Sequence, residues 1–393
     1  DQLRLRGPTG REAAFYQCAL DSCIFLVQEK MDDGSLGPPF AYLGVHVDDI
    51  LLIGEEKVRK QLQELLSATF PVEDWETNHF EYIGSLISVE KDRVTITQTM
   101  YAETRLFTVD ILAGQKDDEE ATEDQKADGQ SLVGALGWLA NQSRPDLQVG
   151  VSMAQQVQKD PLVGDIKFVN QLARKAEEHK DEGIVLYPIK KENVVFLAYH
   201  DAGWANSPQD PEDPHYALSK NEDLSGQVRS GPPGLVHKKL KKQNSKIASQ
   251  LGSILFMADE SVLTGSPARL SLLDWKSHAC QRVCRSTFAA ESMACADALE
   301  GAQYMRAFYE TLVSGKLRKV ADCMHEIHLF TDCKSLYDTV TKEGLPRMPS
   351  DRRLAIDLAA LRMDLDAEKG HRTQMHWVPT TVQEADMLTK PMK

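Results

Sequence analysis

The second half of the chain alternates apolar segments with helical ones in an order that strongly restricts the possible folds. Three strands come first, followed by a long helix, a strand, an amphipathic helix and a final strand. In that order, the segments are 193–206, 249–259, 268–278, 286–312, 326–335, 354–365 and 372–379. This order predicts an α+β or α/β fold in which the strands form an open sheet and the helices pack against it.

Four acids lie at the ends of these strands or on a helix packed against them. They are Asp201, Glu291, Asp332 and Asp386. Ser286 or Thr287 is expected to cap the long helix, which places Glu291 in its first turns. Because open sheets gather active sites at strand ends, we expect the four side chains to converge.

Converging carboxylates predict a metal site. Like charges raise one another's pKa, so four neighbouring carboxylates cannot all stay ionised without counter-ions. Two Mg²⁺ or Mn²⁺ ions would neutralise them, because hard oxygen ligands suit these metals and suit zinc poorly. Two ions would also activate water and stabilise a leaving oxygen. Taken singly, each acid is better explained as a cap or a loop residue; the four in this order favour the metal site.

A second acidic feature lies in the first half, where Asp48 and Asp49 interrupt the apolar run YLGVHVDDILLIG of residues 42–54. The run predicts two short buried strands that meet at a tight turn, with the two acids at its tip. Unpaired carboxylates in such a setting cost several kcal/mol, so a divalent metal is one explanation. A polar hairpin turn explains the pair equally well, because Asp is a common turn residue.

The rest of the chain divides into smaller segments. We expect a helix over 55–70, a hairpin over 80–98, an acidic solvated linker over 116–130, and helical segments over 131–157 and 165–180. The predicted domains are 1–115, the linker 116–130, 131–182 and 183–393. The cluster HKKLKKQNSK contains Lys238, Lys239, Lys241 and Lys242. It is either a solvated loop, the favoured interpretation, or a set of phosphate contacts.

Composition limits the classes of function. A chain of 393 residues, 42% hydrophobic and 26% charged, predicts a globular protein of two or three domains. We expect no membrane partner, because no apolar run is long enough to span a bilayer and no signal peptide is visible. The seven cysteines form no CxxC pair, which favours reduced thiols and an intracellular location. The net charge of −14 excludes a uniformly basic surface but not a nucleic-acid partner.

Several motifs resemble the C-terminal part of the Pol polyprotein of copia-type LTR retrotransposons, nearly from end to end. DSCIFLV and HVDDILLIG resemble the segment leading into the family's Tyr-Val-Asp-Asp hairpin, and FEYIGSLI resembles a stretch downstream of it. SLVGALGWLANQSRPDLQVGVS resembles a further block of the family. DAGWAN, STFAAESMA, FTDCKS and EADMLTKP resemble the motifs of its ribonuclease H domain, and this set is the most specific.

The resemblance implies a partial reverse-transcriptase palm, a helical thumb or connection, and a ribonuclease H-like domain built on a mixed five-stranded sheet with flanking helices. It makes Asp201, Glu291, Asp332 and Asp386 the nuclease tetrad that binds two Mg²⁺ or Mn²⁺ ions, and Asp48 and Asp49 the polymerase pair. The implied partners are an RNA·DNA hybrid, primer-template nucleic acid, and upstream Pol segments, namely the rest of the reverse transcriptase and the integrase. The implied location is a cytoplasmic particle or the nucleus.

Departures from the family limit these implications. No palm acid precedes the hairpin in a matching strand, His46 replaces the usual Tyr, and the loop VPTTVQEAD lacks the His of many cellular ribonucleases H. The chain begins with Asp1 rather than Met, so we expect a fragment or a processed piece, with a C-terminus close to the natural one after ADMLTKP.

The expected function is a ribonuclease H that cleaves the RNA strand of RNA·DNA hybrids by two-metal catalysis, attached to a truncated RNA-directed DNA polymerase. Two alternatives stay open. One is a decayed remnant that binds nucleic acid without catalysis, and the other is a complete reverse transcriptase whose upstream part is missing from this sequence.

Overall fold

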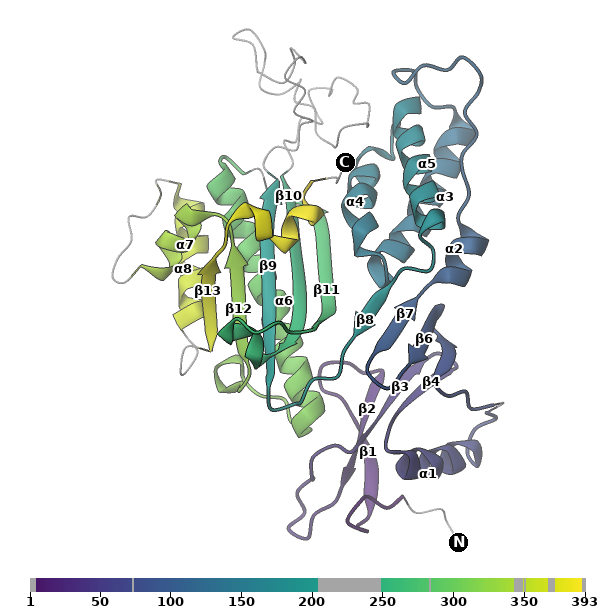
Figure 1. The fold of residues 1–393 in the computed structure, drawn as a ribbon, viewed down its shortest axis with the longest axis vertical. Helices are drawn as coiled ribbons and strands as arrows, with labels where there is room; N and C mark the ends of the chain where they lie inside the picture. Colours follow the sequence, from purple (N-terminus) through teal and green to yellow (C-terminus); the bar gives the residue numbers. More distant parts are fainter. Residues whose placement is uncertain are drawn as a thin grey trace.

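The computed structural model describes residues 5–72, 74–203, 249–282, 284–342, 349, 351–366 and 372–390. The basic cluster of Lys238, Lys239, Lys241 and Lys242 lies outside the described residues. The described part contains three sheets and the helices that accompany them (Figure 1). Among the helices described, none combines the length and the apolarity that a membrane crossing requires.

A mixed five-stranded sheet forms the framework of the second half, as the sequence predicts. Its strands are β9 (Val194–Gly203), β10 (Gln250–Asp259), β11 (Leu270–Ala279), β12 (Glu326–Thr331) and β13 (Thr373–Trp377), in the order β11-β10-β9-β12-β13. The first three strands pair antiparallel, whereas β12 is parallel to both β9 and β13. The carboxyl ends of β9, β12 and β13 therefore lie at the same edge of the sheet.

Three helices accompany this sheet: α6 (Thr287–Ser314), α7 (Lys334–Thr341) and α8 (Arg352–Asp366). The long helix α6 packs across one face, over β9 and β10 (Figure 1). Ser286 is its N-cap, since the Ser286 hydroxyl accepts a hydrogen bond from the main-chain nitrogen of Ala289, and one of the two predicted caps is thereby confirmed. Helix α7 is not predicted by the sequence, because only Leu336 and Val340 mark its buried face and one such pair gives no detectable period.

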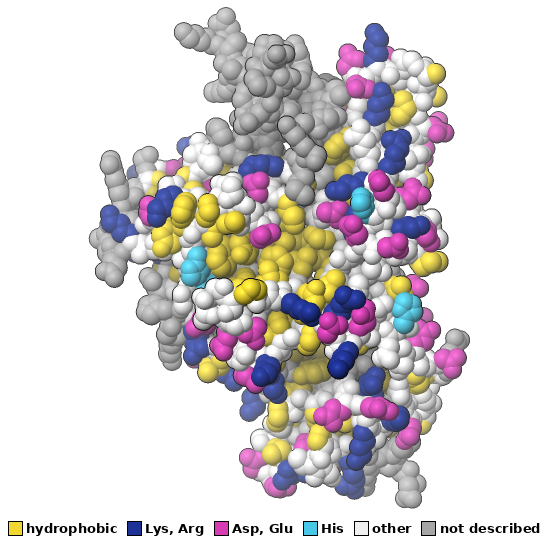
Figure 2. Space-filling model, in the orientation of Figure 1, with side chains coloured by type: hydrophobic (Ala, Val, Ile, Leu, Met, Phe, Trp, Pro, Cys, Tyr) yellow, Lys and Arg dark blue, Asp and Glu magenta, His cyan; other side chains and the backbone are white. Residues whose placement is uncertain are grey.

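Apolar side chains gather on the opposite face of the sheet (Figure 2). Tyr199 of β9 stacks on Phe330 of β12 with ring centroids 4.5 Å apart, and Phe330 stacks on His376 of β13 at 5.1 Å. The three residues are direct cross-strand neighbours. Because side-chain pairs of this kind fix the register of a sheet, the row aligns the three parallel strands and the acids that follow them.

The first half begins with a four-stranded antiparallel sheet. Its strands are β1 (Ala13–Gln17), β2 (Ile24–Glu29), β3 (Ala41–His46) and β4 (Asp49–Gly54), in sequence order. Helix α1 (Glu56–Ser67) follows within the predicted range 55–70 and buries Val58, Leu62 and Leu66 on one face. The helix ends before Pro71, as predicted from the restriction that proline places on a helix.

A second four-stranded sheet contains β5 (His79–Tyr82), β6 (Ser85–Val89), β7 (Val94–Thr97) and β8 (Ile184–Leu186). Strands β6 and β7 form the hairpin predicted over 80–98. Strand β8 lies at the start of the predicted domain 183–393, and it pairs with β7 rather than with the five-stranded sheet. The chain therefore returns to this small sheet before it enters the second half.

The helical part of the first half contains α2 (Thr99–Arg105), α3 (Glu123–Gln142), α4 (Gln148–Val157) and α5 (Val163–Glu178). Helix α3 begins inside the segment 116–130 that was expected to be a linker. A capping box explains the early start, because Thr122 and Gln125 each accept a hydrogen bond from the other's main-chain nitrogen. The single helical segment expected over 131–157 is divided at Pro145, where the 3₁₀ helix η1 (Pro145–Leu147) separates α3 from α4.

Buried hydrogen bonds join the helical part to the five-stranded sheet. The indole nitrogen of Trp275 on β11 donates to the main-chain oxygen of Ala140 on α3 at 2.8 Å. Gln250 Nε2 donates to the hydroxyl of Ser152 on α4 and to that of Ser277 on β11, both at 2.8 Å. These buried polar groups are therefore satisfied across the contact, which fixes α3 and α4 against β10 and β11.

Candidate metal centre

Three of the four predicted acids meet at one edge of the five-stranded sheet. Asp201 lies near the end of β9, Asp332 directly follows β12, and Glu291 lies in the first turns of α6. One oxygen atom from each of the three carboxylates lies within 4.8 Å of the other two. The parallel pairing of Tyr199 with Phe330 brings the two strand ends together, which makes the acids that follow neighbours.

Burial determines the electrostatics of this acid cluster, which we define as Asp201, Glu291 and Asp332. Asp201 and Glu291 are 3% and 4% exposed, whereas Asp332 is partly exposed. Burial raises the pKa of Glu291 to about 9, and the charges of Asp201 and Asp332 act in the same direction. Burial also raises the pKa of Asp201, against the opposing effects of Thr389 and Lys390. The three carboxyl groups are therefore not all ionised at neutral pH unless a cation is bound.

The residues present fit a divalent cation. Oε2 of Glu291 is buried and has no hydrogen-bond partner among the described residues. Nδ1 of the fully buried His200 lies 4.0 Å from that oxygen, but burial lowers the pKa of His200 to about 3, so its ring is neutral and supplies no positive charge. All three ligand groups are hard carboxylates, which suit Mg²⁺ and Mn²⁺. Across the described part of the chain, this is the one cluster of His, Cys, Asp or Glu side chains arranged to hold a metal.

The fourth predicted acid, Asp386, lies beside the cluster but is not one of its three members. It belongs to the 3₁₀ helix η5 (Glu384–Leu388), and its carboxylate accepts a hydrogen bond from Nζ of Lys390. The same ammonium nitrogen lies 4.0 Å from Oδ2 of Asp201. Burial alone would lower the pKa of Lys390, but Asp386 and Asp201 together raise it above its usual value. Lys390 therefore supplies a positive charge between the fourth acid and the cluster.

Hydrogen bonds from other side chains hold two of the acids in place. The hydroxyl of Thr389 donates to Oδ2 of Asp201, and the hydroxyl of Thr380 donates to Oδ2 of Asp332 at 2.7 Å. The indole nitrogen of Trp377 donates to the main-chain oxygen of Asp332 at 3.1 Å. Such partners orient ligand side chains, as the outer shell of a metal site commonly does.

The sequence reasoning missed Thr380, Thr389, Lys390 and His200. The two threonines act through single hydroxyls in C-terminal segments, which have no periodic pattern. His200 lies next to Asp201 on an apolar strand, where its burial depends on the packing of α6. Lys390 offered the one detectable signal, since it stands four residues after Asp386 and such pairs meet on a helical turn.

The structure places Asp48 and Asp49 at the β3–β4 hairpin turn, but both side chains are exposed. Val47, the preceding turn residue, is 88% exposed and has a φ of 54°. In the described residues, no third acid, histidine or cysteine joins the two acids at ligand distance. Exposed carboxylates keep their hydration, so the predicted cost of burying them, and with it the need for a compensating metal, does not arise here.

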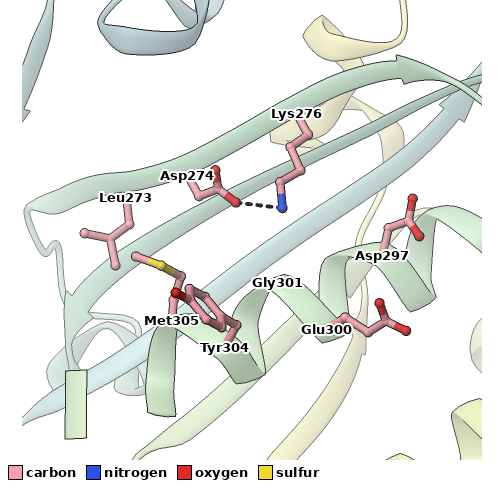
Figure 3. Close-up of a pocket in the computed structure, with 8 residues that line it drawn as sticks. All are labelled: Leu273, Asp274, Lys276, Asp297, Glu300, Gly301, Tyr304 and Met305. Carbon is pink, nitrogen blue, oxygen red and sulfur yellow. Dashed lines mark ion pairs between the residues drawn. The ribbon is translucent and has the colours of Figure 1, made fainter. Parts of the chain in front are cut away.

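A groove of about 570 Å³ lies between β11 and α6, and none of the four predicted acids lines it (Figure 3). Its lining residues are Leu273, Asp274, Lys276, Asp297, Glu300, Gly301, Tyr304 and Met305. Asp274 pairs with Lys276 at 3.2 Å, and Asp297 pairs with His278 at 3.2 Å. Two acids of this groove are therefore paired with basic side chains of neighbouring positions on β11.

No family model matches the chain, and no curated protein matches it significantly. Solved structures similar to part of the chain include the N-terminal RNase H domain of a Mycobacterium tuberculosis protein, solved as a fusion with maltose binding protein. It is 15% identical, covers 50% of this chain and 91% of its own, and has a TM-score of 0.28.

Two further solved structures have the same range of similarity. RNase H1 from the halophilic archaeon Halobacterium salinarum NRC-1 is 13% identical, covers 48% of this chain and 89% of its own, and has a TM-score of 0.25. LC11-RNase H1, solved in complex with an RNA/DNA hybrid, is 13% identical, with coverages of 49% and 92% and a TM-score of 0.27. Likenesses this low do not define the function of this chain, whose site rests on the sheet order and the acid cluster described above.

Proposed function

We propose that residues 183–393 form a metal-dependent ribonuclease H that hydrolyses the RNA strand of RNA·DNA hybrids. The observation that carries this proposal is the meeting of Asp201, Glu291 and Asp332 within 4.8 Å of one another, two of them buried. The resemblance of DAGWAN, STFAAESMA and FTDCKS to ribonuclease H motifs supports the choice of substrate, because these motifs contain the same three acids.

The three acids of the cluster and the two threonines bonded to them would position the metal ions for the reaction. Two Mg²⁺ or Mn²⁺ ions would supply the activation of water and the neutralisation of charge at the scissile phosphate. Asp201 and Glu291 would hold them from the buried side, and the partly exposed Asp332 would hold them from the side that solvent and substrate reach. Thr389 and Thr380 fix the carboxylates of Asp201 and Asp332, so the ligand atoms are in place before the substrate arrives.

We propose a narrower role for residues 1–182, as part of a polymerase palm with a helical connection that does not synthesise DNA on its own. The resemblance of HVDDILLIG to the family's hairpin supports the palm origin. Nucleotidyl transfer depends on positioned metal ions and charge neutralisation. Within the described residues, Asp48 and Asp49 have no third acid beside them to complete such a site.

The test of the nuclease is cleavage of an end-labelled RNA·DNA hybrid by the purified chain, in Mg²⁺ and in Mn²⁺. We expect cleavage of the RNA strand that leaves a 3′-hydroxyl and a 5′-phosphate, and no cleavage after metal removal by a chelator. Asp201→Asn and Glu291→Gln should abolish the cleavage. Asp48→Asn is the matched control, since it removes one acid from the exposed hairpin and should leave cleavage intact.

The alternative of a decayed remnant predicts a different result in the same experiment. A folded chain that binds the hybrid in a filter-binding assay, yet cleaves it with neither metal, would overturn the nuclease proposal in favour of a binding module. Equal cleavage of a DNA duplex would instead overturn the proposed substrate.

A further inference from the structure

Two cysteines that the sequence spacing did not connect are in contact at the base of α6. Cys280 directly follows β11, Cys284 lies just before α6, and their sulfur atoms are 3.7 Å apart. Cys280 is partly exposed, whereas Cys284 is buried. A pair with one accessible and one protected sulfur has the arrangement needed for an attacking and a resolving thiol.

Packing holds the described residues at and beside the two cysteines in place. The main-chain nitrogen of Cys280 donates to the oxygen of Ser249 at 2.6 Å. Arg282, between the cysteines, forms an ion pair with Asp357 of α8 at 3.0 Å. Cys284 packs in an apolar cluster that includes Ala202, Ala290 and Ala294. The contact between the sulfurs therefore follows from the attachment of Cys280 beside the sheet and from the packing of Cys284 against α6.

We propose that Cys280 and Cys284 form a redox-active dithiol, which low-molecular-weight disulfides such as oxidised glutathione convert into an intramolecular disulfide. The difference in pKa between the two thiols indicates which of them reacts first. The hydrogen bond from the Cys284 thiol is the main cause that lowers the pKa of Cys280 to about 6, and the same contact raises the pKa of Cys284. Cys280 is therefore the attacking thiolate and Cys284 the resolving thiol.

The reaction balances in two exchange steps. The Cys280 thiolate attacks one sulfur of the small disulfide, forming a mixed disulfide and releasing one small thiolate. Cys284 then loses its proton and attacks the Cys280 sulfur, which forms the protein disulfide and releases the second small thiolate. Two protein thiols are oxidised by two electrons, and the small disulfide is reduced to two small thiols.

The test uses the full chain, incubated with oxidised glutathione, alkylated and digested with trypsin. Trypsin cuts after Lys276, Arg282 and Arg285, so it separates Cys280 from Cys284. A disulfide therefore appears in the mass spectrum as peptide 277–282 joined to peptide 283–285, with the loss of two hydrogens. We expect this joined pair to form and reduced glutathione to reverse it.

Variants identify the role of each sulfur. Cys284→Ser should trap glutathione on Cys280, and Cys280→Ser should react at least about tenfold more slowly, because the remaining thiol is buried. Cys23→Ser, which removes an exposed cysteine elsewhere, is the control and should still form the joined pair. The proposal is overturned if the unmutated chain carries glutathione on Cys280 without forming the joined pair, or if neither cysteine reacts. No step uses the acid cluster, so this result is independent of the nuclease test.

Discussion

The chain carries two groups of acids that differ in how far their side chains are exposed to solvent. Asp48 and Asp49 are adjacent in the sequence and exposed at a hairpin turn. Asp201 and Glu291 are distant in the sequence, come from a strand and a helix, and are 3% and 4% exposed. Hydrated carboxylates need no counter-charge, whereas burial raises the pKa of the buried ones, so that their full ionisation requires a cation. Adjacency in sequence is therefore a weaker indication of a metal site than convergence with burial.

Hybrid cleavage is where we expect the largest difference between the two groups. Asp201→Asn should lower the single-turnover rate by about a thousandfold, because it removes a charged ligand from the acid cluster. Asp48→Asn should leave the rate within about twofold, since its side chain is exposed and is not a member of the acid cluster. The measurement is cleavage of a labelled hybrid in Mg²⁺, with circular dichroism to confirm that both variants fold. A comparable loss of activity in Asp48→Asn would contradict the prediction that only the acid cluster contributes to cleavage.

The second expected difference between the two groups of acids is smaller. It concerns the free energy of unfolding and how this changes with pH. The pKa of Glu291 is about 9 in the folded protein and near its usual 4.5 in the unfolded chain, so the folded state binds this proton more tightly. Its contribution to stability is then fully present below pH 4.5 and is lost as the pH rises toward 9. We expect metal-free protein to lose on the order of a few kcal/mol over this range.

Urea unfolding in the presence of a chelator, at several pH values, measures this loss. Glu291→Gln should flatten the dependence, because the amide does not titrate. Addition of Mg²⁺ should restore stability at high pH, where the ion takes over the role of the proton. Identical pH profiles for the unmutated chain and Glu291→Gln would show that burial of Glu291 does not set the electrostatics of the cluster.

The same contrast explains which features were predictable from the sequence. The five strands of the second half are apolar runs of ordinary strand length, so their order and the acids at their ends could be inferred from pattern alone. The hairpin was also placed correctly, but its exposure was not, because an apolar run carries no information on what covers it. Ile53 of β4, for example, is 53% exposed. The contacts of Thr389 and Lys390 depend on tertiary packing and have no sequence period.

Lys390 offers a smaller test of the cluster. Its ammonium lies 4.0 Å from Asp201 and would repel a bound cation, so Lys390→Gln should tighten Mg²⁺ binding by about threefold to tenfold. Metal-free stability at neutral pH should fall by less than about 1 kcal/mol, because the lysine side chain is 56% exposed. Calorimetric titration with Mg²⁺ measures the first effect and thermal unfolding the second.

Lys60→Gln is the matched control for Lys390. Lys60 forms an exposed ion pair with Glu56 at the same i,i+4 spacing as Lys390 and Asp386, but it lies on α1, outside the cluster. Its replacement should leave Mg²⁺ affinity unchanged. Equal affinities for the two lysine variants would mean that the Lys390 charge does not act on the bound ion.

The smallest effect is expected at the hairpin itself. Asp49→Asn should change the free energy of unfolding by less than about 0.5 kcal/mol, because the exposed carboxylate has lost little hydration. The change should also be the same with and without Mg²⁺, since a ligand that stabilises the folded state does so only where it binds. Chemical unfolding of both proteins in Mg²⁺ and in chelator gives the four values needed. A loss of stability that appears only in Mg²⁺ would show that the hairpin holds a cation despite its exposure, and the distinction between the two groups of acids would then lie in accessibility alone.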